Sequence, residues 1–287
     1  MPPFPIIDAH VHLWDTTRFA IPWLAGVPAI NRVFDTSAFT EQATGLPIQA
    51  FVFVEVNVLP EQALAEVQWA LACAQVEPRL QGIVAAAPVE QGDAVRNHLN
   101  ALQTLSPLIK GVRRPIQDET DPFFCLSDEF VSGVRLVGAY GWSFDLCLRH
   151  TQLAAAIELV RQCPETAFML DHLGKPDVRE HTLTPWREEL TQLAALPNVF
   201  CKLSGLVTEA DPMTWTIDEL RPYVDAALVA FGEDRVVFGG DWPVLLLASS
   251  YPRWIDTLAA LTAHLPEGAQ RKLWAENARR FYRISNP

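Results

Sequence analysis

The sequence predicts an α/β protein in which all 287 residues form a single (β/α)8 barrel of the TIM type. Eight short runs rich in β-branched and aromatic residues recur along the chain, and amphipathic segments separate them. The first and last runs start at Ile6 and Val236, 230 positions apart, so seven intervals average about 33 residues, the size of one βα unit. No low-complexity stretch or charged linker divides the series, so one domain over residues 1–287 is expected.

Each expected strand is an apolar run bounded by turn residues. The eight runs are Ile6–Leu13, Ala50–Val58, Gly82–Val89, Ile109–Ile116, Trp142–Leu148, Ala167–Leu173, Val199–Leu206 and Val236–Val244. Barrel enzymes carry their chemistry at the carboxyl ends of such strands. The polar residues that close these runs are therefore the first candidates for function.

The segments between the strands show the spacing and the end signals of helices. Glu61–Val76 places Leu64, Val67 and Leu71 at helical spacing. Helix starts are predicted at Thr151, at Thr184 followed by Pro185, and at Thr216, which has capping-box spacing to Glu219. An open doubly wound sheet is the alternative architecture, but no G-x-G-x-x-G motif follows an early strand.

Composition argues against several classes of function. The chain has 22 Lys and Arg against 34 Asp and Glu, and the resulting formal charge of −12 disfavours a nucleic-acid or anionic membrane surface. No apolar run approaches the roughly 20 residues of a transmembrane helix, and no signal peptide is visible. Five cysteines without a C-x-x-C pair indicate reduced thiols. We expect a cytoplasmic protein, a monomer or small homo-oligomer, that acts on a small molecule.

Histidines and an aspartate close three of the expected strands. His10 and His12 alternate along the first strand, so both side chains lie on one face and can bind a common ion or substrate. Isolated H-x-H pairs are often unrelated structural histidines, but the end of a first barrel strand favours ligands. His172 closes the sixth strand and Asp241 the eighth, which neighbours the first in a closed barrel. Asp241 has a turn or cap as its structural alternative, but beside the two histidines it can activate a water.

The chain carries six motifs in barrel order between Ile6 and Tyr282: I-D-A-H-V-H-L-W, G-V-R-R, L-D-H-L-G-K-P, K-L-S-G-L, G-G-D-W-P-V and E-N-A-R-R-F-Y. Together they resemble the amidohydrolase superfamily, in particular its lactonase-rich branch, which contains L-fuconolactonase, L-rhamnonolactonase and 2-pyrone-4,6-dicarboxylate lactonase. The resemblance implies that His10, His12 and Asp241 bind metal and activate water. It also implies His172 as a further ligand or catalytic group.

The resemblance bears on the number of metal ions as well. Binuclear members use a lysine or glutamate on strand four and histidines on strands five and six, whereas this chain has Arg113 and Arg114 on strand four and Asp145 on strand five. At most one divalent metal is therefore implied, and ligands of nitrogen and carboxylate favour zinc. The dicarboxylate lactonases of the branch work without a metal, so the resemblance leaves open whether the metal is essential.

Other polar residues at the mouth are candidates for binding substrate or for pairing with one another. Glu55 lies near the end of strand two, where a carboxylate between valines is costly without a partner. Arg113 can polarise a carbonyl or hold a carboxylate with its bidentate fork, and a salt bridge at the rim is its structural alternative. Asp145 and Lys202 either contact substrate or pair with Arg113 or with each other.

Aromatic residues suggest a surface for a sugar ring. Trp14, Trp142 and Trp242 lie beside expected strand ends, and flat aromatic faces suit the C–H surface of a sugar, although packing explains most tryptophans. The segment 15–40 is longer than the usual βα connection of about 2–6 residues, so we expect it to cover the pocket.

These features predict a hydrolase that opens a sugar-acid lactone. Water activated at Asp241 attacks the carbonyl, which the metal or Arg113 and His172 polarise. Fuconolactone is the first choice of substrate and rhamnonolactone the second. A decarboxylase of aromatic acids, a lactonase for a pyrone dicarboxylate and a sugar-acid binder without activity are the alternatives.

Overall fold

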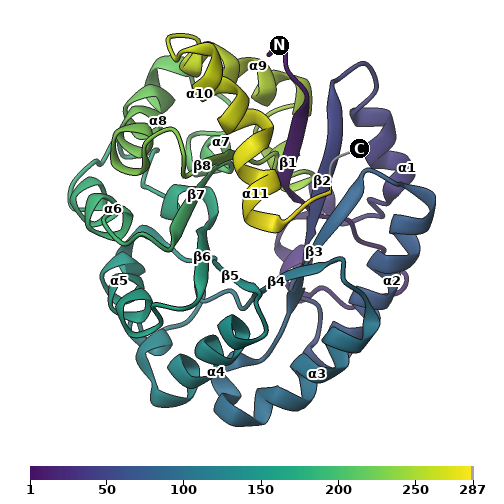
Figure 1. Ribbon diagram of the computed structural model, residues 1–287. Helices are drawn as coiled ribbons and strands as arrows, with labels where there is room; N and C mark the ends of the chain where they lie inside the picture. Colours follow the sequence, from purple (N-terminus) through teal and green to yellow (C-terminus); the bar gives the residue numbers. More distant parts are fainter. Residues whose placement is uncertain (286–287) are drawn as a thin grey trace.

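The computed structural model describes residues 1–285 and contains one parallel sheet in which eight strands follow one another in chain order (Figure 1). The strands are β1 (Ile6–Val11), β2 (Ile48–Val54), β3 (Leu80–Ala86), β4 (Ile109–Arg113), β5 (Ser143–Leu146), β6 (Ala167–Leu170), β7 (Val199–Leu203) and β8 (Val236–Phe238). A parallel bridge from Val11 to Trp242 joins β1 to the segment after β8 and closes the barrel. The predicted (β/α)8 barrel is confirmed, and the open doubly wound sheet is excluded because its strand order would reverse.

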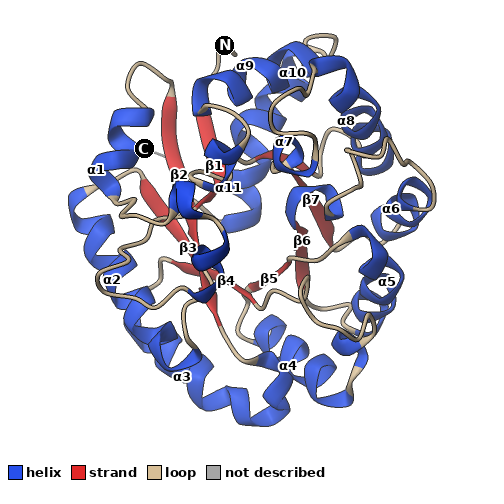
Figure 2. Cartoon of the chain, turned by 180° about the vertical axis from the view of Figure 1, so that it is seen from behind, coloured by secondary structure: helices blue, strands red, loops and turns tan. Residues whose placement is uncertain are grey.

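Helices surround the barrel on its outer side (Figure 2). In the described part of the chain they are α1 (Thr36–Gln42), α2 (Ala63–Val76), α3 (Arg96–Leu105), α4 (Asp128–Ala139), α5 (Leu153–Gln162), α6 (Trp186–Ala194), α7 (Leu206–Glu209), α8 (Ile217–Phe231), α9 (Tyr251–Thr262), α10 (Glu267–Arg271) and α11 (Asn277–Tyr282). Their apolar faces bury the outward side chains of the strands in one continuous core. Within residues 1–285, no helix is both long enough and apolar enough to span a membrane.

All eight predicted strands are present, but each ends two to six residues earlier than the apolar run that predicted it. The segment after β2 shows why. Glu55, Val56 and Val58 remain buried although the strand has ended at Val54. The connections at the carboxyl ends are packed into the barrel mouth, so their apolar composition continues the pattern of the strands.

The helix starts are only partly as predicted. Thr216 and Glu219 form the expected capping box of α8. The prediction of a cap at Thr151 is wrong, because Thr151 lies inside a 3₁₀ turn before α5, where the side chain of Gln152 accepts the N–H of Arg149 instead. Pro185 is the N-cap of α6 rather than its first residue.

The last helix closes one end of the barrel. In Figure 1, α11 crosses the barrel at the amino ends of the strands. Phe281 and Tyr282 pack with the inward residues Ile7 and Val237, and Asn277 Nδ2 donates to the carbonyl of Val236. With this end covered, the opposite end is the one that offers a cavity to solvent.

Candidate active site

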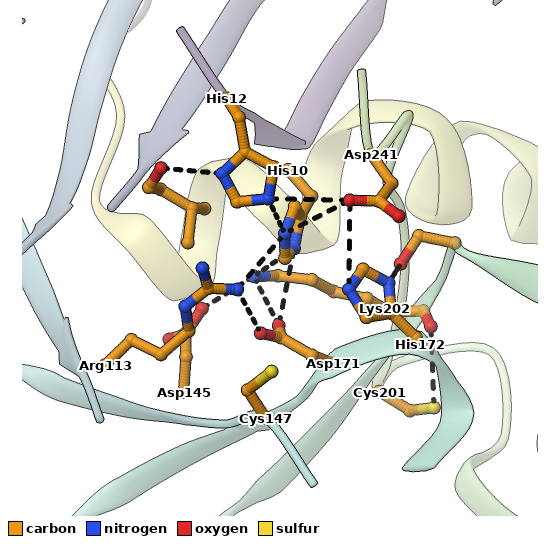
Figure 3. A network of polar contacts seen from close by, with 12 residues as sticks. His10, His12, Arg113, Asp145, Cys147, Asp171, His172, Cys201, Lys202 and Asp241 are labelled. Carbon is orange, nitrogen blue, oxygen red and sulfur yellow. Dashed lines mark hydrogen bonds and ion pairs between the residues drawn. The ribbon is translucent and has the colours of Figure 1, made fainter. Parts of the chain in front are cut away.

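The carboxyl ends of β1, β6 and β8 bring four predicted site residues together (Figure 3). We call His10, His12, His172 and Asp241 the ligand cluster. His10 Nε2 lies 3.1 Å from His12 Nε2, and Asp241 Oδ1 lies 3.7, 3.5 and 3.9 Å from the Nε2 atoms of His10, His12 and His172. A tetrahedron with corners about 2.0–2.1 Å from its centre, the usual zinc–nitrogen distance, has edges of about 3.3–3.4 Å. His10, His12 and Asp241 have ligand atoms within 4.8 Å of one another, a spacing that suits one metal ion, and His172 Nε2 lies beside Asp241.

Contacts on the far side of the imidazoles orient them for this role. His12 Nδ1 lies 2.8 Å from the carbonyl oxygen of Val54, which only accepts, so Nδ1 carries the proton and Nε2 keeps its lone pair. His172 Nδ1 lies 2.8 Å from Ser204 Oγ. Such outer contacts fix the ring and tautomer of metal-binding histidines.

The backbone at the site adopts an uncommon conformation. Asn57, His172, Lys175 and Asp241 have φ between 48° and 56°, and they are four of the seven non-glycine residues with positive φ in the described chain. All four line the same cavity. A left-handed conformation costs such residues about 1–3 kcal/mol, and its concentration here is typical of a functional site. Gly205 leaves room for the His172 ring, because a Cβ at Gly205 would lie 2.6 Å from His172 Nδ1.

Asp8, which we did not select as a site residue, joins the two strands that carry most of the ligand cluster. Its Oδ1 accepts the N–H groups of His10 and Gly240 at 2.9 and 2.8 Å, and its Oδ2 accepts the hydroxyl of Tyr251 at 2.6 Å. The carboxylate thus ties the end of β1 to the segment that leads into Asp241. The signal was present, since Asp8 is part of the I-D-A-H motif, but its role depends on a partner 232 positions away.

Next to the ligand cluster lies a set of buried ion pairs, which we call the ion-pair network: Glu55, Arg113, Asp145, Asp171 and Lys202. Lys202 Nζ lies 2.6 Å from Asp145 Oδ2, 2.8 Å from Asp171 Oδ1 and 3.2 Å from His10 Nδ1. His10 Nδ1 also lies 3.4 Å from Asp171 Oδ1, and a proton on Nδ1 directed at this carboxylate leaves the lone pair of His10 Nε2 to the ligand cluster. Tyr282 adds a hydrogen bond to Asp145 Oδ2 at 3.0 Å. Asp145 and Lys202 thus pair with each other, one of the two roles considered from the sequence.

Arg113 occupies the other half of this network. Its Nε donates to Glu55 Oε1 at 2.6 Å, its Nη2 to the Glu55 carbonyl at 2.6 Å and its Nη1 to Asp171 Oδ2 at 3.2 Å. Arg113 also borders the cavity, whereas Glu55 is completely buried. Glu55 therefore acts through Arg113. Asp171, which was not selected from the sequence, forms ion pairs with both cations of the network, Arg113 and Lys202.

Burial and nearby charges set the protonation states of the ligand cluster. Burial acts to raise the pKa of Asp241, but the contacts with His172, His12 and His10 lower it by more. The net shift is downward, so the carboxyl stays ionised at neutral pH. Burial lowers the pKa of His172 to about 4. Burial and the charge of Lys202 hold the pKa of His10 well below its usual range. His10 and His172 are thus neutral, as metal ligands must be.

The charge balance of the site also fits one divalent cation. The ion-pair network and Asp241 together contain four carboxylates and two cations, which leaves two negative charges in a buried region. A second group of possible ligands, His10, Asp171 and His172, has the required spacing. However, Lys202 and Arg113 already occupy both oxygens of Asp171. The group of His10, His12 and Asp241, with His172 beside Asp241, is therefore the one whose donor atoms suit a divalent metal.

The structure corrects the positions expected for the three tryptophans. Trp14 and Trp242 are fully buried, because each packs edge-on against Phe34 beneath the segment 15–40. Trp142 precedes β5 and lies at its amino end, away from the mouth. Trp23 is the tryptophan that borders the cavity, and its Nε1 donates to the carbonyl of Val56 at 2.8 Å. The long first connection thus covers part of the mouth, as expected.

The ligand cluster opens into a cavity of about 150 Å³. Besides His12, Arg113, His172 and Asp241, its walls include Trp23, Val56, Asn57, Pro115, Gln117, Asp118, Cys147, Lys175 and Val244. Lys175 Nζ donates to Gln117 Oε1 at 2.5 Å and forms no ion pair in the described chain. Sequence reasoning missed this cation, although it stands in the L-D-H-L-G-K-P motif.

Comparisons with known proteins agree with the geometry. An amidohydrolase family model matches residues 7–284. L-fucono-1,5-lactonase of Burkholderia multivorans is 32% identical over 300 residues, which cover 98% of this chain and 97% of that protein. L-fucono-1,5-lactonase of Burkholderia ambifaria is 28% identical over 286 residues, which cover 98% of this chain and 96% of that protein.

A solved structure provides a further comparison. The crystal structure of an amidohydrolase from Burkholderia multivorans with bound zinc superimposes with a TM-score of 0.89 and 30% identity, covering 98% of this chain and 100% of that one. The resemblance stated from the six motifs is confirmed.

Proposed function

The chain belongs to the amidohydrolase family, and from this premise we propose that it is a lactonase that hydrolyses the cyclic ester of a neutral sugar acid. The observation that carries the proposal is the convergence of three imidazoles and the Asp241 carboxylate on one point of the barrel mouth. The two relatives named L-fucono-1,5-lactonase support hydrolysis of an ester bond and make an L-fucono-1,5-lactone the first substrate to test.

Asp241 is the proposed base. Its closest contacts to the three histidines all involve Oδ1, and Figure 3 shows Oδ2 turned away from His10 and His12. Oδ2 accepts a proton from water as the water oxygen bonds to the lactone carbonyl carbon. The ester C–O bond then breaks, and Asp241 returns the proton to the ring oxygen. The product is an open-chain hydroxy acid, which releases its carboxylic proton at neutral pH.

We propose that His10, His12, His172 and Asp241 hold one divalent metal, with zinc as the first candidate, since a zinc-bound amidohydrolase shares this fold at 30% identity. When bound, the metal supplies a Lewis acid for the carbonyl oxygen and lowers the pKa of water. The chain itself supplies the rest of the machinery. Esters need less assistance for the leaving group than amides do, which is consistent with a single-metal site.

Arg113 and Lys175 are the cations that face the substrate. Arg113 is held in place by Glu55 and Asp171 and still borders the cavity, so it can polarise the lactone carbonyl without moving. Lys175 and Gln117 lie across the mouth and offer hydrogen bonds to hydroxyl groups. His172, completing the site, acts as a ligand in this arrangement; direct polarisation of the carbonyl by its imidazole is its alternative role.

A panel of lactones tests the proposal. Purified protein loaded with one equivalent of zinc is incubated with L-fucono-, L-rhamnono- and other aldonolactones, and acid release is followed with a pH indicator. The expected result is proton release from at least one sugar lactone above the spontaneous rate. Absence of release from every aldonolactone contradicts the proposal.

A second arm separates the alternative functions. Aromatic carboxylic acids are offered under the same conditions and carbon dioxide is measured, because the decarboxylase alternative uses a similar set of ligands. A pyrone dicarboxylate is included among the lactones. Carbon dioxide release without lactone hydrolysis would identify a decarboxylase, whereas lactone binding without turnover would identify a binding protein.

A further inference from the structure

A second cavity lies beside the catalytic one, at the carboxyl ends of β2, β3 and β4, and has a volume of about 340 Å³. The two cavities share Asn57, Arg113 and Pro115 in their walls, so they adjoin. The catalytic cavity, at about 150 Å³, is smaller than the roughly 300–1,000 Å³ of most ligand pockets, whereas the second lies within that range. Apart from Arg113 and Glu55, which holds it, the reaction proposed above uses none of the lining of the second cavity.

Small apolar residues form much of this lining. They come from the connection after β2, the first residue of α2 and the end of β3, and they are Val58, Pro60, Ala63, Ala86, Ala87 and Pro88. Alanine at three of these positions leaves the space that larger side chains would fill. Such a surface can contact the C–H groups of a saturated ring.

The polar part of the lining is electrically compensated. Four charged residues line the cavity and form two pairs, Arg113 with Glu55 at 2.6 Å and Arg114 with Glu90 at 3.2 Å. His98 Nε2 lies 2.9 Å from the carbonyl of Ala86 and must donate to it, which leaves Nδ1 as an acceptor. Burial also lowers the pKa of His98, so the ring is neutral at pH 7.

Two amide side chains complete this neutral polar set. Asn57 and Gln91 border the cavity, and within residues 1–285 neither side chain is engaged in a hydrogen bond. Together with His98 Nδ1 they offer both donors and acceptors without net charge. The lining as a whole therefore matches a ring that has apolar C–H faces and several hydroxyl groups.

We propose that this second cavity binds a glycosyl substituent, so that the substrates include lactones of aldonic acids that carry a second sugar ring. The inference rests on the proposed lactonase function. With the ester carbonyl at the ligand cluster, the part of the substrate beyond Arg113 and Asn57 enters the second cavity. The chemistry is unchanged: water adds to the carbonyl carbon, the ester C–O bond breaks, and the glycosidic bond stays intact.

The test compares kcat/KM for single-ring aldonolactones with that for a panel of two-sugar lactones, such as maltobionolactone and cellobionolactone. The wild-type chain is expected to prefer at least one two-ring lactone by about 10-fold or more, the effect of a modest set of added contacts. No preference for any two-ring substrate would overturn the subsite.

Variants locate the preference in the second cavity. Ala87→Leu fills the cavity and should bring the ratio of the two kcat/KM values close to one, whereas the matched control Ala154→Leu, at an exposed position of α5, should keep the wild-type ratio. Gln91→Ala removes an exposed amide, and we expect the ratio to fall by about 3- to 10-fold, as the loss of one hydrogen bond predicts. Thermal unfolding of each variant confirms that it is folded.

The outcomes separate the two levels of the proposal. An equal ratio in the Ala87→Leu and Ala154→Leu variants, or an unchanged ratio in Gln91→Ala if Ala87→Leu does not fold, overturns the subsite. Hydrolysis of single-ring lactones without any preference overturns the subsite alone. Failure to hydrolyse lactones of either kind overturns the proposed function and the subsite with it.

Discussion

The ligand cluster and the ion-pair network are adjacent sets of buried titratable side chains, yet they use their polar atoms in opposite ways. In the network Lys202 pairs with the carboxylates of Asp145 and Asp171, and Arg113 is held by Glu55 and Asp171. In the ligand cluster the Nε2 atoms of His10 and His12 and Asp241 Oδ1 point toward one another, 3.1–3.7 Å apart. One set is complete as it stands, and the other has the donor atoms and the charge to receive a metal.

The difference shows which evidence identifies a reactive site. Perturbed pKa values occur in both sets: burial lowers the pKa of His172, whereas opposite charges outweigh burial and lower the pKa of Asp171 and raise that of Lys202. What separates the two is satisfaction of hydrogen bonding: each charge of the network has partners of opposite charge, whereas the Nε2 atoms of the ligand cluster point toward one another. We infer that the ligand cluster carries the chemistry and that the network holds His10 and Arg113 in position for it.

The largest effect is expected for Asp241→Asn, which removes the proposed general base from the ligand cluster. An amide of the same shape cannot accept the proton of water, so kcat should fall by about 10²–10⁴-fold. Initial rates on the best lactone measure the loss. Asp256→Asn, an exposed carboxylate of α9, is the matched control and should retain its rate. Unchanged turnover in the Asp241 variant would remove it from the mechanism.

Metal content tests the contrast between the two sets directly. We expect one divalent ion per chain, because Lys202 and Arg113 occupy the carboxylate of the second ligand group. Chelation should abolish activity, and zinc should restore it. His12→Asn should bind zinc at least about 10-fold more weakly, since it removes one ligand. Elemental analysis after dialysis gives the stoichiometry; two ions per chain, or full activity without metal, would contradict this assignment.

Lys202→Met breaks the ion-pair network instead. The variant leaves Asp145 and Asp171 buried without their ammonium, so the free energy of unfolding should fall by about 3–5 kcal/mol. Urea unfolding curves measure this change. The double variant Lys202→Met with Asp145→Leu should regain part of the stability, because one of the unpaired carboxylates is gone. A single variant as stable as the wild type would show that the network contributes little to the fold.

The fold could be predicted from the sequence because the strand and helix signals of each βα unit depend on residues close together in the chain. The eight apolar runs and the capping box at Thr216 depend on neighbours within a few residues, and the structure contains them all. The strand ends were placed too late, since burial of the following loops depends on tertiary packing that no local pattern records. The same reasoning placed Trp142 at the mouth, although it lies at the amino end of β5.

The site could be predicted where its residues stand at strand ends and missed where they act through distant partners. His10, His12 and Asp241 follow from strand position alone. Asp8 and Asp171 were overlooked beside the histidines that they support, because their partners Gly240, Tyr251 and Lys202 are 31 or more positions away. Such long-range contacts of Asp8 and Asp171 can be identified only from the three-dimensional structure of the barrel.

The smallest effect is expected for Glu66, a buried acidic side chain without an ion-pair partner in residues 1–285, which can be compared with the paired acidic groups of the ion-pair network. It lies on α2, its Oε1 accepts the N–H of Val56 at 2.9 Å, and its Oε2 has no partner in the described chain. Burial and repulsion from Glu55 raise its pKa to about 8, whereas Glu55 itself has Arg113 as a partner. The pair thus compares a carboxyl with and without the ion-pair network.

The consequence for stability follows from proton linkage. An unfolded chain releases the Glu66 proton near pH 4.5, but the folded protein keeps it up to about pH 8, so the free energy of unfolding should fall as pH rises between these values and then level off. Glu66→Gln removes this slope, and the variant should be more stable than the wild type by roughly 2–4 kcal/mol at pH 8.5 and nearly equal to it at pH 5. Urea unfolding between pH 5 and pH 9 measures the difference, with the exposed Glu61→Gln as control. Parallel curves for the Glu66 variant and the wild type would mean that Glu66 is ionised in the folded protein, and that burial without a cation is tolerated here.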